Sequence, residues 1–252
     1  MSVLCSNLEL LDTALCDYLS FKEIATQPSW GLADEIVNGW LTRRQQLDEA
    51  NAQTGDGFNP LELIPLKETT HSRILGEMLD PKGSHGQKSL FLGCFLRLLG
   101  VPRAAQDDKW RITVEKSRVD IMLIHDQPRS AILIENKSND AWDQPNQIYR
   151  YWHQHVYLVD PSLNYQDPDV RQRFRIIYLP TDGSKTPASH SLQRPEGWKS
   201  LNPAEVIPLQ CETIAFPELL ALFHREARTS IPATNVRLLA FLDFYHDYWR
   251  TV

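Results

Sequence analysis

Three apolar runs that lie close together between residues 110 and 137 constrain the fold more than any other part of the chain. They occupy residues 110–116, 119–125 and 130–137, and each has the length and the β-branched content of a strand. Residues 126–129 form the turn between the last two runs. Strands that are joined by connections this short pair antiparallel. The sequence therefore predicts an antiparallel meander.

Helical patterns stand on both sides of the meander. Apolar residues recur at helical spacing over residues 67–79 and 87–99. After the meander, Pro145 suits the first turn of a helix that we expect to be capped by Asp143 and to run to about residue 155. A helical crossover of this kind returns the chain parallel to the strand before it. The next strand should therefore make the sheet mixed.

The remaining segments complete an α/β protein. A strand is expected at residues 174–179 and a short edge strand at 206–209. The polar, proline-bearing segments 160–173 and 182–200 are expected to be loops. Two helices end the chain, at about residues 212–227 and 234–250. We predict a mixed central sheet that is flanked by helices.

The beginning of the chain has the pattern of a separate helical segment. Apolar residues recur at helical spacing over residues 7–26 and 32–52, and turn-forming residues break the pattern between 54 and 60. We expect a helical hairpin, residues 1–58, that packs on a core domain of residues 59–252. Scaffold helices without chemistry are the favoured interpretation of this hairpin.

The composition is that of an ordinary globular protein, with 42% hydrophobic and 23% charged residues among 252. The net charge of −6 indicates no global basic field, which weakens a nucleic-acid interpretation, although a local basic groove can exist on an acidic body. No apolar run approaches the roughly 20 residues of a membrane-spanning helix, and the acidic N-terminus does not resemble a secretory signal. The cysteines form no Cys-x-x-Cys pair, which argues against zinc and for a reducing compartment: Cys5, Cys16, Cys94 and Cys211. We expect a cytoplasmic protein without a membrane partner.

Acidic residues and a lysine lie at the ends of the predicted strands in a pattern that suits phosphodiester hydrolysis. Asp120 lies near the start of the second strand, and Glu135, Asn136 and Lys137 end the third. Side chains two apart on a strand share a face, so Glu135 and Lys137 point the same way, and the neighbouring strand can place Asp120 beside them. Carboxylates bind Mg²⁺ or Mn²⁺, and a lysine can orient the attacking water or stabilise the developing negative charge.

The metal ligands expected from this pattern are Asp120 and Glu135, with the main-chain carbonyl of Asn136 completing the shell. Glu68 supplies a further carboxylate from the preceding helix, where residues 71 and 72 share its face. The alternative interpretation of an isolated Glu-x-Lys is a solvated strand end with a routine surface ion pair. The upstream acid and the order of the elements favour the metal site.

These residues resemble the motif of the PD-(D/E)XK nuclease superfamily, whose restriction-endonuclease-like core has the order α-β-β-β-α-β. Asp120 takes the place of the motif's aspartate, Glu135 that of its second acid, and Lys137 that of its lysine. Asn136 fills the variable position. The proline that names the motif is missing, as in many branches of the superfamily, because Val119 precedes Asp120.

The chain is most similar to a bacterial group of this superfamily, over roughly residues 60–225. The group has Glu-x-x-His-Ser and Leu-Asp-Pro on a helix, then His-Gly, Arg-(Ile/Val)-Asp-Ile, Ile-Glu-Asn-Lys and Asp-Gln-x-x-Gln-x-x-x-Tyr. The matching segments are residues 68–72, 79–81, 85–86, 118–121, 134–137 and 143–151. Gln147 and Tyr151 also match the Gln-x-x-x-Tyr element of RecB-like nucleases.

The resemblance implies a nuclease that depends on Mg²⁺ or Mn²⁺ and acts on DNA, with RNA as the other candidate, in phage defence, restriction or repair. The site residues it implies are catalytic Glu68, Asp120, Glu135, Lys137 and Gln147, and substrate-binding Tyr151, His71 and Ser72. A structural role is favoured for His71. For Tyr151, core packing with Tyr149 and Trp152 is an equal alternative.

The alternative function is a catalytically silent nuclease fold that binds nucleic acid or a protein partner. The acidic net charge favours this alternative somewhat. The presence of every expected catalytic residue type argues against it. The choice between a monomer and a homodimer stays open.

Overall fold

The computed structural model describes residues 31–55, 57–101, 107, 109–116, 118–139, 141–199 and 204–251. The chain divides into two compact units. One unit is Met1–Pro65 with Phe244–Val252, and the other is Leu66–Asp243. The domain boundary that we predict after residue 58 stays a prediction.

In the first unit, helix α2 runs from Gly31 to Thr54 and confirms the helix predicted at residues 32–52. Its predicted hairpin partner at residues 7–26 lies outside the described residues. A 3-10 turn follows at Pro60–Leu63, where the Asn59 side chain accepts a hydrogen bond from the Leu61 N–H at 3.0 Å. The Asn59 amide also donates to the Phe244 carbonyl at 2.8 Å, which ties the turn to the C-terminal segment.

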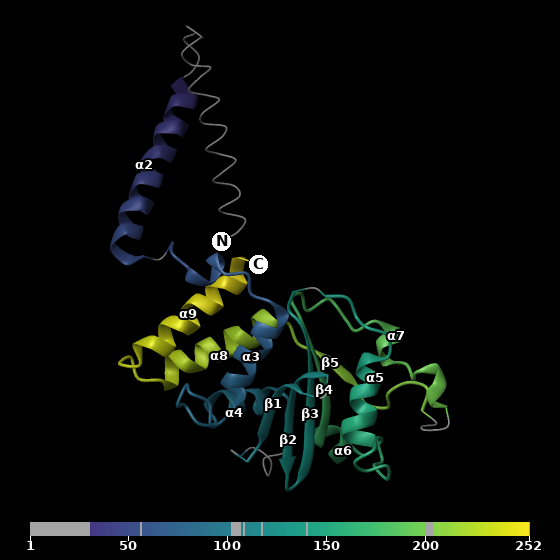
Figure 1. Cartoon of the computed structure of the whole chain (residues 1–252). Coiled ribbons are helices and arrows are strands. Elements are labelled where there is room, and N and C mark those ends of the chain that lie inside the picture. Colours follow the sequence, from purple (N-terminus) through teal and green to yellow (C-terminus); the bar gives the residue numbers. More distant parts are fainter. Residues whose placement is uncertain are drawn as a thin grey trace. The chain divides into compact units, whose positions relative to one another are not determined.

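The second unit is built on one five-stranded sheet, shown in Figure 1. Its strands are β1 (Arg111–Lys116), β2 (Val119–Asp126), β3 (Arg129–Lys137), β4 (Phe174–Pro180) and β5 (Cys211–Thr213). They lie in the order β1-β2-β3-β4-β5. The first three pair antiparallel, whereas β4 pairs parallel with β3 and β5 with β4. The predicted meander, crossover and mixed sheet are therefore confirmed.

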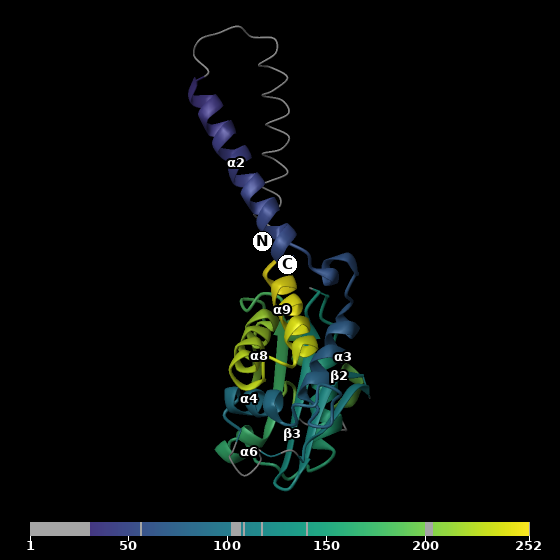
Figure 2. The same ribbon diagram turned by 90° about the vertical axis from the view of Figure 1, so that its left-hand side faces the viewer.

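Three helices cover one face of the sheet: α3 (Glu68–Leu79), α4 (Leu90–Leu98) and α8 (Phe216–Ser230). Figure 2 looks onto this side and shows these helices in front of the strands. The rings of Phe91 and Phe223 lie 5.4 Å apart between α4 and α8. Helix α3 approaches β1 closely at Gly76, where a Cβ atom would lie 2.2 Å from a methyl group of Val114. The sequence predicted all three helices.

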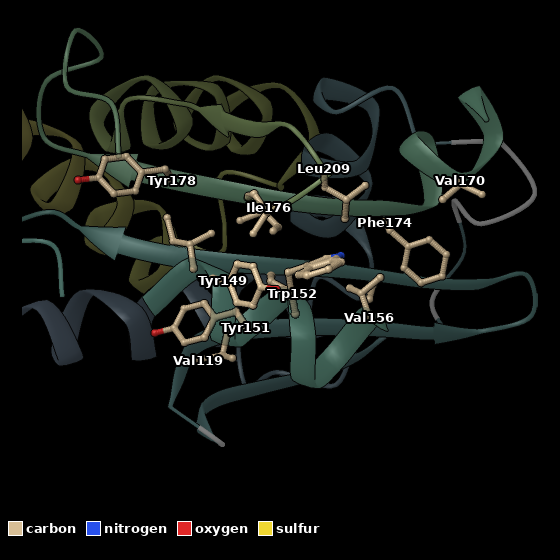
Figure 3. Packing of buried hydrophobic residues seen from close by; sticks show 14 residues of the cluster. Val119, Tyr149, Tyr151, Trp152, Val156, Val170, Phe174, Ile176, Tyr178 and Leu209 are labelled. Atoms are coloured by element: carbon tan, nitrogen blue, oxygen red, sulfur yellow. The ribbon is translucent and has the colours of Figure 1, made fainter. Parts of the chain in front are cut away.

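The opposite face of the sheet packs on helix α5 (Gln147–Trp152) through a buried apolar cluster, shown in Figure 3. Helix α5 continues as a π-helical turn, His153–Tyr157, which extends it to about the predicted end. Large aromatic rings fill this layer, and Tyr149, Trp152 and Tyr178 are fully buried. A helix this short is only marginally stable on its own, so the burial of its apolar side chains is what stabilises the crossover helix.

The cap of α5 differs from the prediction. The helix begins at Gln147 after Asn146, which has a left-handed backbone with φ of 59°, so Asp143 does not cap it. The Asn146 amide group donates to the Gln193 carbonyl at 2.7 Å, and its N–H donates to the His190 carbonyl at 2.8 Å. These tertiary bonds determine where the helix starts, and they leave Asp143 to other partners.

Three further expectations were wrong. The edge strand is β5 and not residues 206–209, where Val206 makes only an isolated bridge with Gln193. The segment expected to be a loop at residues 160–173 contains helix α6 (Pro168–Arg173), which is capped by the Asp167 side chain. The segment expected to be a loop at residues 182–200 contains helix α7 (Ser189–Leu192) and a 3-10 turn at Glu196–Trp198. The remaining helix is α9 (Val236–Thr251). Within the described residues, we find no helix with the length and apolar character that a membrane crossing requires.

Candidate active site

The register of β2 and β3 places the two predicted acids next to each other. The last regular pair is Ile121 with Ile134, and one step further along both strands brings Asp120 level with Glu135. Residues that lie opposite each other in an antiparallel pair project from the same face. The N–H of Asn136 donates to Asp120 Oδ2 at 2.8 Å, which fixes the aspartate at the strand end.

Glu135 and Lys137 form a buried ion pair on this face. Lys137 Nζ lies 2.8 Å from Glu135 Oε1, and the two side chains are only 4% and 1% exposed. This burial excludes the routine surface ion pair that we considered as an alternative. Two buried charges lose much hydration, so the pair needs a reason other than simple stability.

Asn136 points to the opposite face of the sheet, where it docks the first turn of α3. Its amide group donates to the Glu68 carbonyl at 3.0 Å and to Ser72 Oγ at 2.9 Å. Its own side-chain oxygen accepts from the Ser138 N–H at 3.1 Å. The variable position of the motif therefore holds Glu68 at the end of β3.

The Glu68 carboxylate belongs to the same electrostatic cluster. Burial raises its pKa, Lys137 lowers it, and the negative charge of Glu135 raises it again. Its Oε1 atom is buried and has no hydrogen bond to any described residue. The structure thus brings a third acid to the pair on β2 and β3.

Burial raises the pKa of Asp120 to about 8, and the nearby charge of Glu135 adds to this effect. The Asn136 N–H opposes it only in part. Burial also raises the pKa of Glu135, although Lys137 acts against it. For Lys137, burial lowers the pKa, but the attraction of Glu135 outweighs it and the net pKa is raised. The site is therefore rich in carboxyl groups that resist losing their protons together, and it keeps its lysine protonated.

This arrangement fits a hard divalent cation. Glu135 Oε2, like Glu68 Oε1, is buried without a hydrogen bond to the described residues, and a cation would satisfy both. Within the described ranges there is no group of three or more acidic, histidine or cysteine side chains that could hold a metal ion. Mg²⁺ does not require one, because it binds one or two carboxylates and keeps several waters.

Gln147 and Tyr151 lie one turn apart on α5 and face the acids. Gln147 Nε2 donates to the Tyr151 hydroxyl at 2.8 Å. Burial raises the pKa of Tyr151, and the charges of Glu135 and Asp120 raise it further. Tyr151 is also 3% exposed and belongs to the aromatic cluster of Figure 3. The ring of Tyr151 therefore packs in the core, and a contact of its hydroxyl group with a substrate stays a prediction.

His71 and Ser72 are placed inside the protein. They are 0% and 1% exposed, and the His71 ring meets the ring of Phe216 edge to face at 5.7 Å. Burial lowers the pKa of His71 to about 4. This placement favours structural roles for both residues over contact with a substrate.

Sequence reasoning missed Asp143 and Tyr178 as neighbours of the site. Tyr178 on β4 is the register partner of Glu135, and its hydroxyl donates to Asp143 Oδ1 at 3.1 Å. Asp143 Oδ2 accepts from the Ala188 N–H at 2.8 Å. The charge of Asp143 contributes to the raised pKa of both Glu135 and Lys137. The aspartate stands in the same motif as Gln147, which is the signal that could have identified it.

Comparisons with known proteins agree with this geometry. A family model described as the PD-(D/E)XK nuclease superfamily matches residues 58–235, which is more than half of the chain. The comparisons with curated proteins and with solved structures give no match. The matched range includes the whole sheet, the acids of β2 and β3, and the crossover helix. The chain belongs to the PD-(D/E)XK nuclease superfamily.

Proposed function

We propose that this protein is a metal-dependent nuclease that hydrolyses phosphodiester bonds of DNA, with RNA as the other candidate substrate. The observation that carries the proposal is the buried Glu135–Lys137 pair with Asp120 level with it on the next strand. Membership of a nuclease superfamily supports the same activity.

In this proposal Asp120 and Glu135 hold Mg²⁺ or Mn²⁺, with Glu68 and the Asn136 carbonyl as further oxygen ligands. The bound ion would neutralise charge on the phosphate and activate a water. The unpartnered oxygens Glu68 Oε1 and Glu135 Oε2 support this assignment. The ion would also relieve the repulsion between the clustered acids.

Lys137 acts as a cation and not as a base. Its pKa is raised by Glu135, so the ammonium keeps its proton near neutral pH. We assign it to orient the attacking water or to donate a hydrogen bond to the phosphate as negative charge develops. Gln147 holds the Tyr151 hydroxyl at 2.8 Å, and this hydroxyl is the group we assign to touch the nucleic-acid backbone.

The test is cleavage of labelled DNA and RNA with Mg²⁺ or Mn²⁺ by the wild type, Glu135→Gln and Lys137→Met. Each substitution should reduce the rate at least about a hundredfold, the usual effect of losing a charge at a reacting phosphate. Asp126→Asn is the matched control, because it breaks an exposed pair with Arg111 at 2.9 Å on the same sheet. Cleavage that persists unchanged in both site variants would assign the activity to something else.

A second candidate is a silent nuclease fold that binds nucleic acid or a protein. The net charge of −6 favours it, and so does the finding that no group of three possible metal ligands stands together among the described residues. Calorimetry with millimolar Mg²⁺, with and without DNA, separates the two, since only the enzyme requires metal binding. The setting in phage defence, restriction or repair, the cytoplasmic location and a homodimeric state are further parts of the proposal that cleavage does not test.

A further inference from the structure

Trp142 is the most exposed large apolar side chain of the described residues, at 94%. It lies in the segment between β3 and α5, five residues beyond Lys137 in the chain. Tryptophan side chains usually bury a large apolar area when a partner is present. The exposed indole beside the buried charge cluster is therefore a candidate binding surface for a partner.

The main chain that carries this indole is held by two ammonium groups. Lys137 Nζ donates to the Trp142 carbonyl at 3.4 Å, and Lys185 Nζ donates to the Ala141 carbonyl at 3.5 Å. Lys137 is also paired with Glu135 in the acid cluster. The position of Trp142 is thus tied directly to the residues that we assign to catalysis.

The next residue, Asp143, anchors the same segment from other directions. Its carboxylate accepts from the Tyr178 hydroxyl and the Ala188 N–H, at 3.1 and 2.8 Å. Its carbonyl lies 3.1 Å from the His190 ring nitrogen. The backbone is therefore held by strand β4 and by residues 188–190, while the indole remains exposed. A platform of this kind loses little conformational entropy when it binds.

The charges around the platform indicate the chemistry of its partner. Lys137 and Lys185 each lie at a carbonyl of residues 141–142, and Lys185 also lowers the pKa of Glu68. The indole and the two ammonium groups fit a partner that offers a flat apolar face together with negative charge. A nucleobase with its phosphate has both, and bases stack on aromatic side chains whatever their sequence. Paired bases inside a duplex do not expose this face.

We propose that Trp142 stacks on an unpaired base next to the bond that is cut, so that the preferred substrate is single-stranded or locally unpaired nucleic acid. This inference rests on the proposed nuclease function. It assigns Trp142 a positioning role and Lys185 a role beside the substrate phosphates.

The experiment measures the affinity of labelled single-stranded and blunt duplex oligonucleotides for the full chain, in EDTA, so that no cleavage occurs. Trp142→Ala should weaken single-strand binding about five- to hundredfold, the range for loss of one base–aromatic stack. Trp142→Phe should recover most of the affinity, because it keeps an aromatic face. Leu158→Ala is the control, since it removes another exposed apolar side chain, at 60%, from the end of the α5 region.

Oligonucleotides with one abasic site at each position in turn sharpen this test. For the wild type, an abasic site at one position should weaken binding about as much as Trp142→Ala does. For Trp142→Ala, an abasic site at that position should weaken binding hardly at all. Unchanged binding by Trp142→Ala, or an equal loss on blunt duplex, overturns the stacking proposal. If the wild type nevertheless cleaves nucleic acid, the proposed nuclease function is retained without the stacking proposal. A wild type that binds no oligonucleotide also overturns the stacking proposal, and the cleavage assay with Mg²⁺ or Mn²⁺ then decides the nuclease function separately.

Discussion

At the scale of single residues, the site violates the rules that govern a stable core. Glu135 and Lys137 are almost fully buried, and burial raises the pKa of Asp120 to about 8 beside the like charge of Glu135. Apolar residues of similar volume in place of such a pair often make a protein more stable. Conflicts of this kind between local rules and a stable fold cluster at functional sites. The physical cost of these charges is therefore itself an argument for a bound cation and an anionic substrate.

His71 provides a pH-dependent prediction at the same scale. Burial lowers the pKa of His71 from 6.5 to about 4. Between pH 6.5 and 4 the imidazole therefore binds a proton in the unfolded chain but not in the folded protein. Its contribution to stability is fully present above about pH 6.5 and is lost as the pH falls toward 4. We expect this loss to reach about 2–3 kcal/mol at pH 4.5. Urea unfolding at pH 7.5 and 4.5 should show a smaller decrease for His71→Gln than for the wild type. Equal decreases would mean that the histidine is protonated inside the fold.

At the scale of elements, the contact between α3 and β1 depends on Gly76. A Cβ atom there would lie 2.2 Å from Val114 Cγ2, and β1 is held in place along its length by its pairing with β2. Gly76→Ala should therefore destabilise the protein by about 1–3 kcal/mol, although alanine is the better helix former by about 1 kcal/mol. Denaturant unfolding measures the difference.

The matched control for Gly76 is Gly93, which lies inside α4. The atom nearest to an added Cβ at Gly93 would be Arg97 Nη1, at 3.3 Å. This atom is the flexible end of a side chain and can move away. Gly93→Ala should be neutral or stabilising by up to about 1 kcal/mol. The double variant Gly76→Ala with Val114→Ala should recover part of the loss. A stabilising Gly76→Ala would show that α3 shifts freely over the sheet.

The meander and the acids of β2 and β3 could be predicted because both depend on local patterns. Apolar runs define the strands, and a short turn at residues 127–128 fixes the register that brings Asp120 to Glu135. The cap of α5 could not be predicted in this way. The helix begins after Asn146 and not after Asp143, because Asn146 makes hydrogen bonds to His190 and Gln193, which lie more than 40 residues away in the sequence. Strand β5, at the sheet edge, likewise depends on pairing with β4 and not on an apolar run of its own.

At the scale of the whole molecule, the family match and the compact units divide the chain differently. The match begins at residue 58, whereas the unit that contains the sheet begins at Leu66. The acids, the lysine and the Trp142 platform all lie within this second unit. Every residue that we assign to the proposed site therefore comes from one compact unit.

The net charge of −6 gives a last prediction, about how the molecule holds nucleic acid. Among the described residues, the cations that we assign to the site are Lys137 and Lys185, so binding should release few counterions. The logarithm of the single-strand affinity should fall with the logarithm of salt concentration with a slope of about −1 to −3, since each phosphate contact contributes about −0.7. Lys185→Gln should make the slope shallower by about 0.7, whereas Lys109→Gln, which removes a 76% exposed lysine, should not. Fluorescence anisotropy between 50 and 300 mM salt, about the range where such slopes are linear, measures it. A slope steeper than about −5 would contradict the idea that a few charges and one stacked base suffice, because it would require an extended track of phosphate contacts.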